Sequence, residues 1–225
     1  SFLTSGGEVT FNDWHCTESI DARLVKEGWN DRGFDDSLWE RVTPAQAPSG
    51  EKMICAAEPV KAYDFRKPVR MWRGERGYIF DFGISGAGTY NLKITGKGGQ
   101  RIEVYTSDCV IEGKKITNRN LYCWSLTDDM ADKVQHDFLT LSGKPDEFEP
   151  RFTFRGFRYA EITGITREQA QSLEITFILY SNSFASAGSF ECDDDRINSL
   201  QECVLNSDRS NFIHFPLDCP QREKN

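Results

Sequence analysis

The sequence predicts a mainly β protein in which one or more antiparallel β-sandwich modules are followed by a C-terminal helix. Three observations predict this class. Short runs that alternate apolar and polar residues recur between residues 76 and 180, glycine-rich segments separate these runs, and a helical period begins only after Asp193. We therefore divide the chain into residues 1–60, an accessory sandwich or jelly-roll-like segment that need not be complete, residues 61–183, a β-sandwich domain, and residues 184–225, a linker, a helix and the start of a further domain.

The first 60 residues are irregular, with large aromatic residues spread among turn formers. Asp35, Asp36 and Ser37 can bond their own backbone and close a turn, which leaves Phe34 and Trp39 to pack inward. We expect a loop pinned by its aromatic rings, in preference to a sugar-binding patch. Proline, serine and glycine at residues 44–50 then indicate a linker or a domain edge.

The β pattern is strongest in the middle of the chain. We expect strands at residues 78–82, 90–94, 102–105, 121–126, 138–141, 152–154, 157–163 and 173–180. The glycine-rich residues 83–88 could be mistaken for a phosphate-binding loop, but such a loop opens a helix, and here residues 89–95 have a β pattern. We therefore predict a turn at residues 83–88.

The pattern changes at residues 193–195, where three aspartates provide an N-terminal cap for a helix. Ile197, Leu200, Val204 and Leu205 then recur at steps of three and four residues and form an apolar stripe. We expect the helix to end near Phe212, because the prolines that follow prevent its continuation. The stripe needs a partner that this chain does not supply.

Composition excludes several classes of partner. The 225 residues carry 27 basic and 35 acidic side chains, a net charge of −8, and the basic residues are scattered among the acids, so no basic face for nucleic acid is expected. The longest apolar run, near Ile178, is too short for a membrane span. Seven cysteines without a CxxC motif and three distant histidines indicate unpaired thiols, packed as small apolar groups, and no metal site.

The last eight residues are the one segment with catalytic chemistry. They place Asp218, Arg222 and Glu223 around a proline and an amide. Glycoside hydrolysis needs one protonated carboxyl group for the leaving oxygen and polar groups that hold sugar hydroxyls. By composition alone, a solvated polar tail is the favoured interpretation of these residues.

A resemblance to a known family favours the catalytic interpretation. The run Asp218-Cys219-Pro220-Gln221-Arg222-Glu223 resembles the signature of bacterial α-L-rhamnosidases. Residues 207–212, 188–192 and 152–159 are similar to other parts of that family, as are residues 80–83 with Gly86 and Gly88, so that the similarity covers about residues 76–225. Residues 34–39 are similar to a run found in galactose-binding-like jelly rolls attached to glycosidases.

The resemblance implies an (α/α)6 catalytic barrel behind the sandwich modules, of which residues 184–225 form the start. It implies inverting hydrolysis of terminal α-L-rhamnosyl bonds in glycosides or polysaccharides, with a rhamnoside as the carbohydrate substrate and no metal or other cofactor. Glu223 aligns with the general acid, and Asp218 and Arg222 with residues that hold rhamnose hydroxyls. The family pattern continues beyond Asn225, so we expect a truncated fragment that is inactive by itself.

Three alternatives remain open from the sequence. The sandwiches could form a non-catalytic carbohydrate-binding module, the barrel could act on another deoxy sugar, and Cys219 could act as a nucleophile with His214 as its base, which Pro216 between them disfavours. The start at Ser1 and the absence of an N-x-S/T sequon favour a bacterial, periplasmic or secreted protein over a cytoplasmic one. No pattern indicates an oligomeric state.

Overall fold

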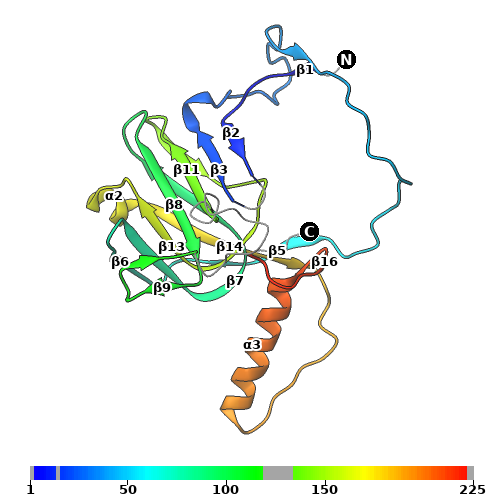
Figure 1. The fold of residues 1–225 in the computed structure, drawn as a ribbon, viewed down its shortest axis with the longest axis vertical. Helices are drawn as coiled ribbons and strands as arrows, with labels where there is room; N and C mark the ends of the chain where they lie inside the picture. Colours follow the sequence, from blue (N-terminus) through cyan, green and yellow to red (C-terminus); the bar gives the residue numbers. More distant parts are fainter. Residues whose placement is uncertain (1–2, 14–15, 119–133, 222–225) are drawn as a thin grey trace.

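The computed structural model describes residues 3–13, 16–118 and 134–221. It is mainly β with a C-terminal helix, as the sequence predicts (Figure 1). In chain order the elements are β1 (Leu3–Thr4), β2 (Val9–Asn12), β3 (Glu18–Asp21), the 3-10 helix Ala22–Leu24, β4 (Glu40–Arg41), β5 (Val60–Arg66), β6 (Arg70–Arg73), β7 (Tyr78–Thr95), β8 (Arg101–Ser107), β9 (Val110–Ile111), β10 (Lys115–Ile116), β11 (His136–Thr140), β12 (Pro145–Phe148), β13 (Arg155–Thr163), α2 (Arg167–Ser172), β14 (Glu174–Asn182), α3 (Asp195–Asn211), β15 (Phe212–Ile213) and β16 (Phe215–Pro216).

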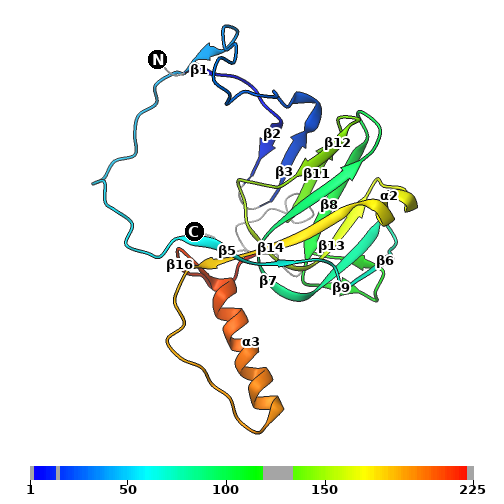
Figure 2. The ribbon, with the colours of Figure 1, turned by 180° about the vertical axis from the view of Figure 1, so that it is seen from behind.

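One large sheet forms the body of the protein. Its strand order is β2-β3-β11-β8-β13-β7-β14-β5, and β6 and β12 also pair with β7 (Figure 2). The pairs in this sheet are antiparallel, as predicted, except that β3 runs parallel to β11. Strands β2 and β3, from the N-terminal segment, thus share a sheet with the middle of the chain.

The sheet consists of two halves that enclose the core, and the long strand β7 belongs to both of them. The first part of β7 pairs with β13 and β6, and its last part pairs with β14 and β12. Side chains from both parts of β7, including Phe82 and Tyr90, belong to one buried cluster. The Phe157 and Phe177 rings, from β13 and β14, lie 3.9 Å apart between centroids. The two halves therefore face each other across a common core, which is the arrangement of a sandwich.

The turn predicted at residues 83–88 is wrong, because β7 continues through it as one strand. Gly83 has φ +77°, a conformation that glycine adopts without a steric penalty. At Gly88, a Cβ atom would lie 1.9 Å from the carbonyl oxygen of Ile178 on β14, so only glycine allows the two strands to approach this closely. The glycines therefore bend and pack a continuous strand where the sequence pattern indicates an interruption.

The strand predicted at residues 152–154 is also wrong. Burial varies along these three residues, since Phe152 is exposed and Thr153 is buried. The backbone amides of Arg151 and Phe152 donate to the carboxylate of Glu18 on β3 at 3.1–3.3 Å instead of pairing with a neighbouring strand. Burial raises the pKa of that carboxyl group, against the effect of these two amides. The strand predicted at residues 121–126 lies outside the described residues.

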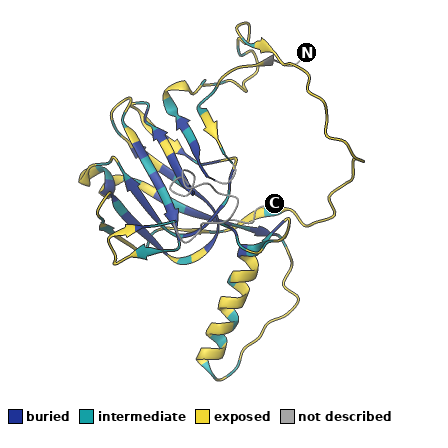
Figure 3. Ribbon diagram, viewed as in Figure 1, coloured by how far each residue is buried: buried dark blue, intermediate teal, exposed yellow. Residues whose placement is uncertain are grey.

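The aromatic loop near the N-terminus has the predicted turn. The Asp35 carboxylate accepts from the Ser37 amide at 3.0 Å, and the Phe34 and Trp39 rings pack edge to face at 5.8 Å. The Lys26 ammonium lies 5.6 Å from the centre of the Trp39 ring. Residues 42–59, which include the linker or domain edge predicted at residues 44–50, then run extended and mostly exposed toward β5 (Figure 3).

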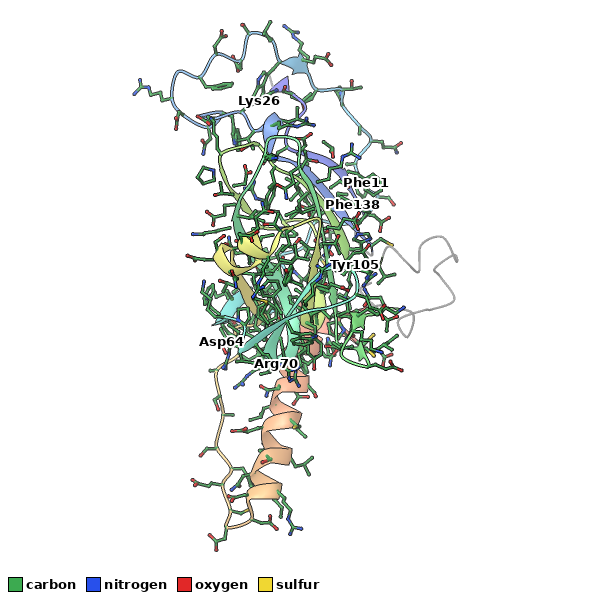
Figure 4. The ribbon with its side chains drawn as sticks, turned by 90° about the vertical axis from the view of Figure 1, so that its left-hand side faces the viewer. Phe11, Lys26, Asp64, Arg70, Tyr105 and Phe138 are labelled. Carbon is green, nitrogen blue, oxygen red and sulfur yellow. The ribbon has the colours of Figure 1, made fainter. Side chains whose placement is uncertain are left out.

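The outer face of the sheet has aromatic side chains of its own. The Tyr105 and His136 rings, on β8 and β11, stack 3.7 Å apart, and His136 also contacts Phe138. Figure 4 shows Tyr105, Phe138 and Phe11 along one edge of the molecule. Burial lowers the pKa of His136, while the neighbouring Glu103 opposes that effect.

Helix α3 begins and ends where the sequence predicts. The Asp194 carboxylate caps it by accepting from the Arg196 amide at 2.9 Å, and Phe212 follows its last residue. Its apolar stripe lies in solvent, with Leu200 63% exposed, and the helix projects away from the sandwich (Figure 1). The expectation that all thiols pack as small apolar groups fails at Cys55 and Cys203, which are exposed. Within the described ranges, no helix is long and apolar enough to cross a membrane.

The ion pair between Asp81 on β7 and Arg158 on β13 predicts a pH-dependent stability. The Arg158 guanidinium donates to both Asp81 oxygens, at 2.8 and 2.9 Å, and this holds the pKa of the carboxyl group below its ordinary value of 3.8. A lowered pKa in the folded state stabilises the protein above the ordinary value, and the contribution is lost as the pH falls through the folded-state pKa. Asp81→Asn should therefore lower the free energy of unfolding at pH 7 by roughly 1–2 kcal/mol, and less as the pH falls below 4.

Urea unfolding of the wild type and the variant at pH 7, 5 and 3 checks this expectation. Asp64→Asn is a suitable control, because its carboxylate is half-buried and bonds a guanidinium, that of Arg66 in the same strand. We expect a small effect of that change at each pH. A stability loss in Asp81→Asn that is equal at pH 7 and pH 3 would contradict the linkage.

Candidate functional site

The segment predicted to be catalytic begins directly after the β15–β16 hairpin. Of its residues, Asp218 is exposed, Cys219 and Gln221 are half-buried, and Pro220 is buried. Arg222 and Glu223 lie outside the described residues. The structure therefore locates the start of the predicted site, and the roles assigned to Asp218, Arg222 and Glu223 stay predictions.

The hairpin turns the chain back onto the sandwich after α3. At its turn, His214 has φ +69°, and its backbone is held by Asn182 at the end of β14. The Asn182 side chain accepts from the His214 amide at 2.7 Å and donates to the His214 carbonyl at 3.4 Å. The amide of Leu217 donates to the carbonyl of Asn211, which closes the connection from helix to hairpin. The following residues therefore start from a fixed point beside β14.

Pro220 and Gln221 pack against Gly156 on β13. A Cβ atom at this position would lie 2.7 Å from both Pro220 Cγ and Gln221 Cδ, so no larger residue fits without a shift. The backbone of Gly156 is bonded on both sides to the amide side chain of buried Gln135, at 3.0 Å each. This glycine lies within the residues 152–159 that resemble the family, and the contact is a physical reason for it.

A second contact between sandwich and segment comes from Asp108, which directly follows β8. One oxygen of its carboxylate accepts from Gln221 Nε2, and the other accepts from the Ser85 hydroxyl on β7. The sequence predicts neither Asp108 nor Ser85 as a site residue. No local pattern marks them, because each acquires its role only when β7, β8 and the chain end meet.

A cavity of about 500 Å³ lies between the bend of β7, the C-terminal half of α3 and residues 219–221. Its described lining offers hydroxyl, amide and thiol groups, among them Ser207 and Asn211, and includes Cys219 but neither Asp218 nor His214. The Asn211 Oδ1 atom is buried with no hydrogen-bond partner among the described residues. Such an acceptor is costly unless a donor fills the site, so the cavity suits a ligand or chain segment with hydrogen-bond donors.

The strand that carries Gly156 is anchored by a buried ionic network. The Arg155 guanidinium donates to both oxygens of the Asp137 carboxylate, which also accepts from the Tyr90 hydroxyl and the Glu18 amide, each at 2.7 Å. Burial, together with Asp137, raises the pKa of the Tyr90 hydroxyl well above its ordinary value, so this group stays a donor. The network joins β3, β7, β11 and β13, and its Arg155 directly precedes Gly156, against which Pro220 and Gln221 pack.

Family models match the chain in three consecutive parts. The alpha-L-rhamnosidase N-terminal domain matches residues 1–64, the bacterial alpha-L-rhamnosidase concanavalin-like domain matches residues 73–179, and the bacterial alpha-L-rhamnosidase 6 hairpin glycosidase domain matches residues 185–225. The chain belongs to the α-L-rhamnosidase family. The resemblance found in the sequence is thus confirmed.

Proteins of the α-L-rhamnosidase family resemble the chain along almost all of its length. An alpha-L-rhamnosidase of Formosa agariphila is 28% identical over 225 residues, which cover 98% of this chain and 23% of that protein. The structure of the alpha-L-rhamnosidase from Dictyoglumus thermophilum matches with a TM-score of 0.83 at 30% identity, over 97% of this chain and 24% of that one. The Streptomyces avermitilis alpha-L-rhamnosidase complexed with L-rhamnose matches with a TM-score of 0.85 at 26% identity, over 97% and 20%. The chain thus spans less than a quarter of the length of these rhamnosidases.

Proposed function

We propose that the chain is the N-terminal part of an inverting α-L-rhamnosidase, which removes terminal α-L-rhamnosyl residues from glycosides or polysaccharides. The observation that carries the proposal is the run from Asp218 to Glu223, which lies inside the residues matched by the 6 hairpin glycosidase domain. The match covers 23% of the Formosa agariphila relative. In this proposal, the rest of the barrel corresponds to the part of that relative outside the match. No observation favours a non-catalytic carbohydrate-binding module over this function.

In the proposed mechanism, Glu223 protonates the oxygen of the leaving group while Asp218 and Arg222 hold the hydroxyls of rhamnose. The general acid needs a raised pKa at neutral pH, which burial or a neighbouring carboxylate supplies. Inversion also needs a second carboxylate, roughly 6.5–9.5 Å from the first, to activate a water on the opposite face of the sugar. That second group comes from the rest of the barrel in this proposal.

We therefore expect the full-length protein to hydrolyse an aryl α-L-rhamnoside and residues 1–225 alone to be inactive. Release of the aryl alcohol measures turnover, and proton NMR of the first product distinguishes β-L-rhamnose, formed by inversion, from the α anomer. Aryl glycosides of α-L-fucose and α-D-glucose are the controls for sugar class. Turnover by residues 1–225, or an α product from the full-length protein, would refute the proposal.

A further inference from the structure

Gln221 connects the sandwich to the segment that carries Glu223, which is only two residues farther along the chain. Its side-chain amide donates to Asp108 Oδ2, and its Cδ atom packs over Gly156. The described part of the segment is therefore held from the side of the sandwich by two groups, Asp108 at the end of β8 and Gly156 on β13.

Asp108 is itself held in place on both sides. The Ser107 hydroxyl donates to the Thr117 carbonyl at 2.7 Å and accepts from the Cys109 amide at 3.0 Å, which fixes the backbone around Asp108. The Ser85 hydroxyl occupies the carboxylate oxygen that Gln221 does not use. Both oxygens thus have a donor, and the carboxylate is aimed at the Gln221 amide before any substrate is present.

The chain between this contact and Glu223 is short. Pro220 packs against Gly156, and its ring fixes the backbone angle φ of the residue just before Gln221. The Asp108 carboxylate holds the Gln221 side chain. Because Glu223 is two positions after Gln221 in the sequence, we expect a shift of the Gln221 anchor to affect Glu223. A displacement of about 1 Å of a catalytic group can cost up to ~100-fold in rate.

We propose that Asp108, with Ser85 behind it, is a positioning residue that sets the placement of the general acid from the sandwich. This inference rests on the proposed function for its effect on catalysis. Asp108 does not touch substrate in this proposal and acts through Gln221. The sandwich then contributes to catalysis through Asp108, in addition to its part in the fold.

Four variants of the full-length protein test the proposal: Asp108→Ala, Gln221→Ala, the double variant and Asp108→Asn. Each alanine variant should lower kcat by about 10- to 100-fold with KM changed by less than about twofold, and the double variant should be no worse than the worse single one. Asparagine keeps one acceptor oxygen, so Asp108→Asn should recover part of the loss. The basic limb of the kcat/KM profile should move to lower pH in the alanine variants, because a displaced, more solvated acid has a lower pKa.

Glu147→Gln is the matched control, because its carboxylate, exposed on β12, accepts from an amide side chain, that of Asn91, at 2.8 Å. It should leave both kcat and the pH profile unchanged. Wild-type kcat and pH profile in Asp108→Ala, or additive losses in the double variant, would overturn the proposal. Hydrogen exchange distinguishes a failure of the positioning role of Asp108 from a failure of the proposed function. If the full-length protein cleaves no rhamnoside, faster exchange of the amides in residues 217–221 in Asp108→Ala still supports the anchoring, and unchanged exchange refutes it.

Discussion

Glu223→Gln in the full-length protein should lower kcat for an aryl α-L-rhamnoside by about 10²- to 10⁴-fold, with KM close to that of the wild type. Glutamine has nearly the shape of glutamate but no proton to give to the leaving oxygen. The loss should be smallest for a 2,4-dinitrophenyl leaving group, which departs without protonation, and largest for an alkyl glycoside. The basic limb of the kcat profile, which reports the loss of the acid's proton as pH rises, should disappear in the variant.

The matched control for this change is Glu191→Gln, which removes an exposed carboxylate from the segment before α3. It should leave kcat and the pH profile unaltered. Steady-state rates on the three leaving groups measure both variants. Equal, small losses in Glu223→Gln for all three leaving groups would mean that another group protonates the glycosidic oxygen.

Arg155→Met should destabilise residues 1–225 by about 3–5 kcal/mol, the largest effect on folding that we expect. The Asp137 side chain is 0% exposed and that of Arg155 is 3% exposed, so the change leaves a carboxylate in the interior without its counter-charge. The remaining donors, the Tyr90 hydroxyl and the Glu18 amide, are neutral and stabilise the charge only partly. Urea unfolding followed by circular dichroism measures the loss.

The double variant Arg155→Met, Asp137→Leu separates the cost of the unpaired charge from the cost of altered packing. It should recover a large part of the stability, because both buried charges are then absent. Arg196→Met removes the partner of Asp194 in an ion pair whose guanidinium is 90% exposed, and this control should cost less than about 1 kcal/mol. If Arg155→Met costs no more than the control, the buried network does not stabilise the fold.

Local patterns in the sequence are sufficient to predict much of this architecture. Alternation predicts the strands that became β8, β11, β13 and β14, and the cap at Asp194 with a stripe at three- and four-residue steps predicts α3. The run from Asp218 to Glu223 indicates the family, which the comparisons confirm. These signals are local, because period, capping and a contiguous motif each depend on residues within a few positions of one another.

Only the tertiary structure decided which strands meet and what the glycines do. Residues 83–88 read as a turn, yet they form the middle of β7, because pairing with β13 and β14 outweighs the low strand propensity of glycine. The contacts of Gly156 and Asp108 with Gln221 have no local signature, since Gln221 lies 65 and 113 positions away, respectively. A residue's own neighbours determine its backbone preference, whereas its contacts across the fold depend on long-range pairings that no short window of sequence contains.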